Sequence, residues 1–271
     1  MVGWSSLTWL MKGEPDDPKH SGYLHSTLAF LISSVITNAV LIKLSKIQGP
    51  RHKKFAIFLG VYTFIVLLAR IKDYKNLALY NMLWQCNISL VSTVLGLWLG
   101  KTDLTAAGVV GVSAVNTLWY PDIISLLIRG KFVVGAAGFL TAKETSFFTA
   151  LTTLHHLWFI PVILYKVRSL PFRGFKLSVL MYLIMANFCR FFIPYQIQKD
   201  GRTHYMNVNM TYEAWKDVKY SFVRFADRNI YLESPWYVTF VALSVIWNSG
   251  NFAGYSLYKY LLKKWLEYSH K

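Results

Sequence analysis

One cysteine and two adjacent histidines are the residues of this chain best suited to chemistry. Cys86 lies in the segment Tyr80–Leu90 (YNMLWQCNISL), which opens an apolar run. His155 and His156 lie inside a second apolar run, in the segment Thr153–Pro161 (TLHHLWFIP). A thiol and an imidazole are the components of a nucleophile–base pair. Cys86 is therefore the candidate nucleophile, and either histidine is its candidate base.

Each of these three residues also has a simpler structural interpretation. A cysteine in a membrane helix is usually a small packing residue, and a buried histidine often bonds a neighbouring helix. Adjacent side chains on a helix point about 100° apart, so we expect at most one of His155 and His156 to be central. Their positions in the sequence do not choose between them.

Polar groups at membrane depth are costly, so other polar residues in the apolar runs are functional candidates too. Asp122 follows Pro121, and its simpler role is to bond backbone groups that a proline kink releases. Arg190 is a candidate positive partner for a thiolate, or else an interfacial anchor. We assign substrate binding or orientation to four residues: Asp122, Asn87, Asn116 and Arg190. Asn116 has the alternative role of joining helices, as do Asn248 and Asn251.

The residue spacing gives no reason to expect a metal ion or another cofactor. Neither an HxxxH nor a CxxC pattern occurs, and haem would need paired histidines on facing helices. A phosphate loop, a serine elbow and paired glutamates are also absent from the sequence. The two cysteines, Cys86 and Cys189, both lie in apolar runs, so they form no disulfide framework.

The composition is that of a membrane protein. The chain has 271 residues, of which 54% are hydrophobic and 15% are charged, whereas soluble domains have about 25% charged residues. The apolar residues form blocks of about twenty, the length of a membrane-spanning helix. Alternating strands of about ten residues are absent. We therefore predict an all-α polytopic integral membrane protein.

The positive charge is best explained by the membrane and not by nucleic acid. The formal net charge is +16, and most lysines and arginines lie in short connections between apolar runs. Such residues set topology and attract anionic lipid headgroups. We expect phospholipids as partners and no nucleic acid.

The hydropathy pattern predicts seven spans within one domain, residues 23–258. A segment at 132–140 is too short to span and is expected to be interfacial or re-entrant. Residues 1–22 are predicted as an interfacial segment without a cleavable signal peptide, and residues 259–271 as a basic tail. The predicted spans are about 23–44, 55–71, 78–100, 104–128, 146–165, 177–197 and 235–257.

The basic connections predict the orientation of these spans. The connections after the first, fifth and seventh spans carry most of the lysines and arginines, so they should share the cytoplasmic face. The long connection that contains residues 198–233 then lies outside, and Thr211–Arg228 has the apolar spacing of an amphipathic surface helix. Asn209 begins a glycosylation sequon. Cys86, the histidines, Asp122 and Arg190 would all lie in the outer half of the bilayer.

Several short motifs occur in a fixed order. They are Asn81–Leu90 (NMLWQCNISL), Tyr120-Pro121-Asp122, His155-His156 with Pro161, His204–Asn207 and Ser234–Tyr237. In this order, over about residues 55–260, the chain resembles the YwaF and transmembrane protein 164 family. The resemblance implies an acyltransferase that moves a fatty acyl chain between phospholipids. It also implies that Cys86 and one of His155 or His156 are catalytic, and Asp122 matches the family's Pro-Asp element. Trp84 and Asn87 stand where the family pattern has histidine and aspartate.

Two functional hypotheses follow from these observations. The first is a phospholipid acyltransferase that forms a thioester on Cys86, with a histidine as base. The alternative is a non-catalytic membrane protein: an accessory subunit with a protein partner in a larger complex, or a lipid-binding scaffold. A solute carrier is disfavoured because no inverted repeat is visible. The host membrane is left open between the endoplasmic reticulum, the mitochondrial inner membrane and a bacterial plasma membrane.

Overall fold

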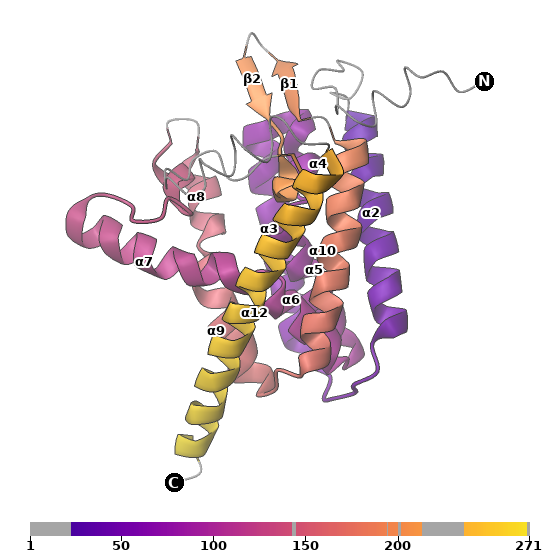
Figure 1. The fold of residues 1–271 in the computed structure, drawn as a ribbon, viewed down its shortest axis with the longest axis vertical. Helices are drawn as coiled ribbons and strands as arrows, with labels where there is room; N and C mark the ends of the chain where they lie inside the picture. The colour runs from indigo at the N-terminus through magenta and orange to yellow at the C-terminus, as the bar shows by residue number, and fades with distance from the viewer. Residues whose placement is uncertain (1–22, 143–144, 194, 200–201, 213–235, 270–271) are drawn as a thin grey trace.

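The described part of the chain is a helical bundle with one small β-hairpin (Figure 1). The computed structural model describes residues 23–142, 145–193, 195–199, 202–212 and 236–269. The prediction of a helical protein is confirmed, and the hairpin is an addition that its short polar strands did not reveal. The elements are α2 (Tyr23–Leu44), α3 (Lys53–Tyr74), η2 (Lys75–Leu77), α4 (Ala78–Asn81), α5 (Gln85–Leu99), α6 (Thr102–Val110), α7 (Ser113–Arg129), η3 (Gly138–Thr141), α8 (Phe147–Thr153), α9 (His155–Val167), α10 (Phe172–Phe192), β1 (Gln196–Lys199), β2 (Arg202–Tyr205), η4 (Val208–Met210) and α12 (Trp236–Ser269).

Four segments within the described residues are long and apolar enough to cross a membrane: Ser26–Leu44, Lys53–Tyr74, Phe147–Val167 and Phe172–Phe192. The pair α6 and α7 makes a fifth if the two helices form one bent span. Large apolar side chains face outward on these helices, and on α3 they include Phe58, Val61 and Phe64. Such a surface suits lipid and not water. These are the properties of an integral membrane protein.

The third predicted span is interrupted. Helix α4 ends at Asn81, and Trp84 has an extended backbone (φ −55°, ψ 138°) immediately before α5 begins at Gln85. Helix α5 has 15 residues, which corresponds to about 22 Å and is shorter than the hydrocarbon layer. The interruption places Cys86 on the first turn of α5, inside the protein.

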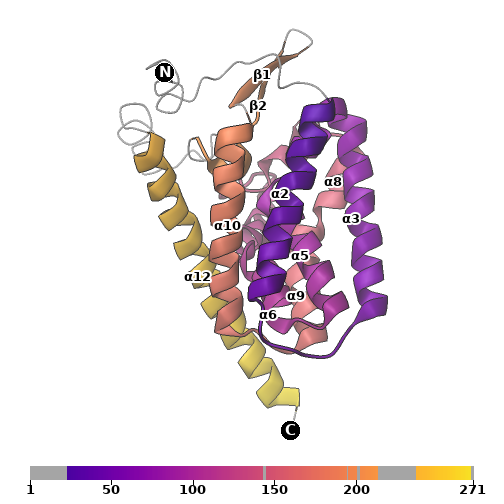
Figure 2. The ribbon, with the colours of Figure 1, turned by 90° about the vertical axis from the view of Figure 1, so that its right-hand side faces the viewer.

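Helices α5 and α6 pack closely because small residues line their contact. A side chain added at Gly108 would meet the backbone oxygen of Ser89 at 2.6 Å, and one added at Gly96 would meet the amide of Thr105 at the same distance. Small residues of this kind let membrane helices approach backbone to backbone. The pair forms a short, rigid hairpin at the centre of the bundle, seen as the magenta helices in Figure 2.

The fourth predicted span is bent by 47° between α6 and α7, so that α7 leaves the bundle sideways in Figure 1. The bend lies near Gly111, and Pro121 lies within the following helix. Asn251 of α12 supports the bend: its amide donates to the Gly111 carbonyl at 3.1 Å and accepts from the Ala114 amide at 3.0 Å. The interpretation of Asn251 as a residue that joins helices is confirmed.

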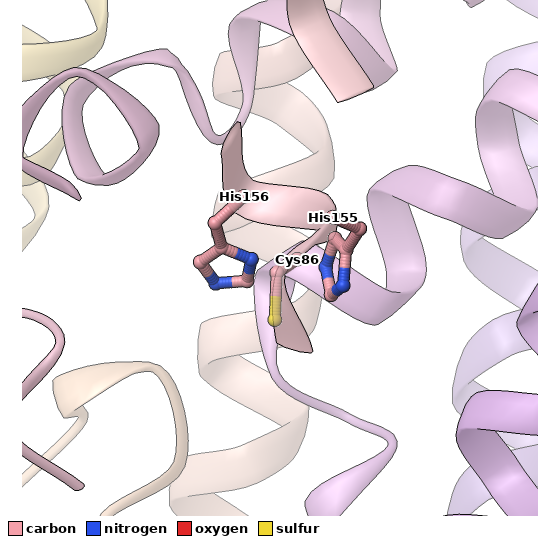
Figure 3. Close-up of side chains that lie close together, drawn as sticks. All are labelled: Cys86, His155 and His156. Atoms are coloured by element: carbon pink, nitrogen blue, oxygen red, sulfur yellow. The ribbon is translucent and has the colours of Figure 1, made fainter. Parts of the chain in front are cut away.

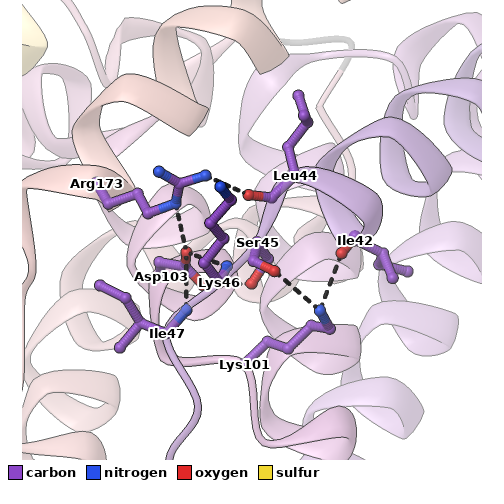
Figure 4. Close-up of polar contacts among 8 residues, drawn as sticks. All are labelled: Ile42, Leu44, Ser45, Lys46, Ile47, Lys101, Asp103 and Arg173. Carbon is purple, nitrogen blue, oxygen red and sulfur yellow. Dashed lines mark hydrogen bonds and ion pairs between the residues drawn. The ribbon is translucent and has the colours of Figure 1, made fainter.

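Three connections meet at the end of the bundle opposite Cys86, around the fully buried carboxylate of Asp103 (Figure 4). It accepts hydrogen bonds from the Ser45 hydroxyl and from the Lys46 amide at 2.8 Å, and it pairs with the Arg173 guanidinium at 3.1 Å. Lys101 donates to the carbonyls at the end of α2 at 2.9 and 3.1 Å. The connections after α2 and α9 therefore lie on one face, as their basic residues predicted, and the connection after α5 lies on the same face.

Some predicted segments differ from expectation, and others lie outside the described residues. Helix α12 continues to Ser269, so the described residues of the predicted basic tail are helical. The predicted interfacial segment 1–22 and nearly all of the amphipathic helix Thr211–Arg228 lie outside the described residues. Segment 132–140 is a loop that ends in η3 and packs on Trp119.

Candidate functional site

Cys86, His155 and His156 come together in the interior, although about 70 residues separate the cysteine from the histidines. One donor atom from each residue, the cysteine sulfur and a nitrogen of each imidazole, lies within 4.8 Å of the other two. Figure 3 shows the Cys86 sulfur between the two rings. The fold thus creates the nucleophile–base arrangement that the residue types suggested.

Two helix interruptions position the three side chains. Cys86 follows the break at Trp84, and the histidines follow a break at Leu154, where α8 ends and α9 begins. All three residues therefore lie on the first turn of a helix that starts inside the protein. The N-terminus of a helix favours negative charge, and Cys86 lies at the start of α5.

The expectation that only one histidine would be central is wrong. The two ring centroids are 4.3 Å apart and the rings are nearly perpendicular, at 76°. The angle of about 100° between neighbouring side chains still applies, but the thiol lies between the two directions and is reached from both. His155 and His156 are both buried.

His155 is held in the geometry of a base. Its Nδ1 lies 2.9 Å from the carbonyl oxygen of Thr152. A carbonyl oxygen only accepts hydrogen bonds, so the neutral ring carries its proton on Nδ1 and leaves the lone pair on Nε2. Within the described residues this Nε2 is buried and has no hydrogen-bond partner. The Tyr62 hydroxyl donates to the same Thr152 oxygen.

His156 has a different environment. Its ring packs against the indole of Trp119, with centroids 4.5 Å apart. His156 also lines a cavity, whereas His155 is not part of the described lining of that cavity. Its Nδ1 is buried and makes no hydrogen bond to any described residue. His156 is therefore the histidine nearer to a bound molecule, and His155 is the one with a fixed tautomer.

Arg70 is a site residue that the sequence analysis missed. It lies on α3, is only 9% exposed, and donates from Nη2 to the Thr153 hydroxyl at 3.1 Å. It lines the same cavity as Cys86 and His156. A charged residue within a predicted span is a sign of function, and Arg70 lies within the second predicted span. It was missed because it lies near the end of that span, where a basic residue usually marks the membrane boundary.

The cavity beside these residues has a volume of about 250 Å³ and is lined by both polar and apolar residues. Cys86 is one of the lining residues, and its side chain is only partly buried. The polar lining residues include Arg70, Asn81, Gln85, Asn87 and Thr153, and the apolar ones are Trp84, Val112, Val115, Trp119, Ala136, Phe139, Met210 and Trp247.

Two side-chain amides flank the cysteine. Asn87, a predicted orienting residue, lines the cavity and donates from Nδ2 to the Asn81 carbonyl at 2.9 Å. Gln85, which the sequence analysis did not single out, also lines the cavity. Neither atom of its amide makes a hydrogen bond to the described part of the protein. Gln85 is thus a donor available to a bound molecule.

Asn209 closes the gap between α4 and α5. Its Oδ1 accepts from the Gln85 backbone amide at 2.7 Å, and its Nδ2 donates to the Leu83 carbonyl at 2.9 Å. The side chain is fully buried. The sequon at Asn209 is therefore not available for glycosylation in the folded protein, because its amide nitrogen is already enclosed and bonded.

Three predicted binding residues have other positions, since Asp122, Asn116 and Arg190 are absent from the lining of this cavity in the described structure. Asp122 accepts from the backbone amides of residues 134, 135 and 137, at 2.6, 3.1 and 3.0 Å. It therefore holds the loop that supplies Ala136 and Phe139 to the cavity wall. Arg190 stacks over Tyr212, with its guanidinium carbon 4.2 Å from the ring centre. The buried amide of Asn116 makes no hydrogen bond to a described residue.

The chain was also compared with models of known families, with curated protein sequences and with solved structures. None of these comparisons returned a match. The geometry of the site therefore carries the functional argument.

Proposed function

We propose that the protein is a membrane-embedded phospholipid acyltransferase in which Cys86 carries the acyl group as a thioester. The observation that carries this proposal is the meeting of the Cys86 thiol with the His155 and His156 rings, beside a cavity lined by polar and apolar residues. A thiol next to an imidazole with a free lone pair is the arrangement that nucleophilic catalysis by cysteine requires. The resemblance of the motif order to the YwaF and transmembrane protein 164 family points to the same activity.

The first half-reaction forms the thioester. His155 Nε2 accepts the thiol proton of Cys86, and the thiolate attacks the carbonyl carbon of a phospholipid ester. The tetrahedral intermediate then collapses, breaking the bond to the glycerol oxygen. The imidazolium returns its proton to this oxygen, so a neutral lysophospholipid hydroxyl leaves. The enzyme holds the acyl group on sulfur.

The second half-reaction transfers the acyl group. His155 accepts the proton of the hydroxyl of another lysophospholipid, and that oxygen attacks the thioester carbonyl. Collapse of this intermediate breaks the carbon–sulfur bond, and the thiolate takes the proton back from the imidazolium. The products are a new phospholipid and the free Cys86 thiol, so no external energy source is required.

Arg70 and Gln85 provide the electrostatic support that such a reaction needs. The negative charge moves from the sulfur to the carbonyl oxygen and then to the leaving oxygen, all within a site that has little water. The Arg70 guanidinium is the cation that lines the cavity beside Cys86, and the unpaired Gln85 amide can donate to the same oxygen. This assignment replaces Arg190, which lies over Tyr212.

The cavity is smaller than a whole phospholipid, so the proposal requires only the ester and the adjoining part of the acyl chain to enter. The apolar lining residues, three of which are tryptophans, suit the acyl chain, and the polar lining residues suit the headgroup region. We also propose that α5, the α6–α7 pair and α12 complete the seven predicted spans. Helix α12 has 34 residues, enough to cross a bilayer at 1.5 Å per residue. Phospholipids are the partners, and the host membrane is an internal eukaryotic or a bacterial plasma membrane.

The test is acyl exchange by the purified full-length chain in lipid nanodiscs. A phospholipid with a labelled acyl chain is supplied together with an unlabelled lysophospholipid of another headgroup. We expect the label to appear in the new phospholipid, and Cys86→Ser and His155→Ala to abolish this transfer. Cys189→Ser is the matched control and should retain it. Transfer by Cys86→Ser at the wild-type rate would contradict the proposal.

A further inference from the structure

The same three side chains form a donor set that suits a metal ion. A thiolate sulfur and two imidazole nitrogens are the ligands that zinc takes most often in proteins. Here one donor atom from each of Cys86, His155 and His156 lies within 4.8 Å of the others. Both histidines are buried. We propose that Cys86, His155 and His156 bind one Zn²⁺ ion, an occupant beyond the proposed acyl-transfer function and independent of it.

The environment of the histidines supports this proposal. A zinc-binding histidine usually donates its second ring N–H to a carbonyl or a carboxylate, which fixes the tautomer and the ring. The contact of His155 Nδ1 with the Thr152 carbonyl, at 2.9 Å, is of this kind. Two ring nitrogens, His155 Nε2 and His156 Nδ1, are buried without a hydrogen-bond partner in the described structure. A bound cation would satisfy nitrogens that are otherwise left without one.

The distances require only small movements. In a tetrahedral zinc site, with bonds of roughly 2.0–2.3 Å, neighbouring ligand atoms lie roughly 3.5 Å apart. The three donor atoms already lie within 4.8 Å of one another, so binding would shorten their separations by at most roughly 1.3 Å. Cys86, His156 and Gln85 all line the cavity, so a water molecule there or the unpaired Gln85 Oε1 can complete the coordination.

The local charge makes this a site of moderate and not extreme affinity. Binding releases the thiol proton to solvent, so the thiolate contributes one negative charge against the two positive charges of the ion. Arg70 lines the same cavity and adds a further positive charge. The Asp73 carboxylate lies one turn away on α3 and offsets part of it. We therefore expect a bound ion that a strong chelator removes.

Zinc and the acyl group would compete for the same sulfur. A thiolate whose lone pair is bound to zinc cannot attack an ester while the ion stays, so zinc should inhibit acyl transfer wherever that transfer exists. The binding itself does not depend on catalysis. The sequence analysis singled out these three residues but did not predict a metal ion, because the ligands come from two distant helix starts and not from a local HxxxH or CxxC spacing.

The test uses the full chain in nanodiscs and reads metal binding directly. Co²⁺ is added first, because a cobalt–thiolate bond gives a charge-transfer absorption in the near ultraviolet, and Zn²⁺ is then used to displace it. We expect one equivalent of cobalt with this absorption, its loss in Cys86→Ser, and at least a tenfold weaker affinity in His155→Ala and in His156→Ala. Cys189→Ser should behave as wild type, because Cys189 belongs neither to the donor set nor to the described lining of the cavity.

A second readout needs no variant. Zn²⁺ should slow the alkylation of Cys86 by a small maleimide, measured by mass spectrometry in the presence of excess ion and reversed by a chelator. The rate at Cys86 in metal-free protein serves as the reference. Absence of the cobalt–thiolate absorption together with unprotected Cys86 would overturn the zinc site, whether or not the protein transfers acyl chains. Loss of acyl transfer with intact cobalt binding would instead count against the proposed function alone.

Discussion

The imidazole of His155 is held by the carbonyl group of Thr152, whose oxygen lies 2.9 Å from Nδ1. Thr152 is the second-last residue of α8 and His155 is the first residue of α9, so the break between the helices creates this contact. The contact points the free lone pair of the ring away from α8. The tautomer of the candidate base is thereby set by the backbone and not by another side chain.

The two histidines should therefore contribute unequally to acyl transfer. We expect His155→Ala to lower the rate by roughly 10²–10⁴-fold, the usual contribution of a general base. His156→Ala should have the smaller effect on the chemical step and should mainly weaken substrate binding, because His156 lines the cavity. Single-turnover measurements of thioester formation separate the two contributions. Equal loss of the chemical step in both variants would contradict the assignment of His155 as the base.

Arg70 should support the transition state through its charge and its planar donors. Arg70→Gln removes both, and we expect the rate to fall by roughly 10²–10³-fold, as for the loss of an oxyanion donor. Arg70→Lys keeps the charge but not the planar donor geometry, so its rate should lie between those of the wild type and Arg70→Gln. Arg190→Gln is the control, because that guanidinium stacks on Tyr212. The prediction fails if Arg70→Gln and Arg190→Gln have the same effect.

Asp103 should stabilise the end of the bundle opposite Cys86. It is fully buried and bonded by the Ser45 hydroxyl, two backbone amides and Arg173. Asp103→Asn removes the charge from all of these bonds, and we expect the free energy of unfolding to fall by at least about 2 kcal/mol. Denaturant unfolding in detergent measures this. Lys264→Gln, which removes an exposed ion pair with Glu267, should change stability by less than about 1 kcal/mol.

Asp122 should act on the cavity wall and not on the substrate. Its carboxylate bonds the amides of residues 134, 135 and 137. Asp122→Asn keeps one acceptor oxygen but loses the charge, so hydrogen exchange of these three amides should become faster. The rate of acyl transfer should fall only if the loop at residues 134–137 moves and changes the cavity wall. A variant that loses all activity while these amides stay protected would show that Asp122 has a direct role in the reaction.

The helical membrane class could be predicted from the sequence because it depends on blocks of apolar residues. Such blocks can be recognised without knowing how the helices pack against one another. The breaks before Gln85 and His155 could not. Neither is marked by proline or glycine, and each is stabilised by a distant contact, such as the bond of Asn209 to the Gln85 amide. The bend near Gly111 likewise depends on Asn251, which lies 140 residues later.

The candidate site was predictable in part for the same reason. Cys86 and the histidines were found because their chemistry is rare within apolar runs. Arg70 was missed because its sequence position resembled a membrane boundary, and only packing against Thr153 shows that it faces the interior. Asp122 and Arg190 were assigned from residue type and from their predicted depth in the bilayer. Their partners, the loop amides and Tyr212, come from segments whose proximity no local pattern reveals.

The most direct measurement is the detection of the acyl group on Cys86. Purified protein in nanodiscs is supplied with a phospholipid that carries a labelled acyl chain, quenched at low pH and analysed by mass spectrometry. The account predicts a hydroxylamine-sensitive adduct on Cys86, absent in His155→Ala and unchanged in Cys189→Ser. Folded, metal-free protein that binds lipid but never shows an adduct on Cys86 would contradict the catalytic role of this cysteine.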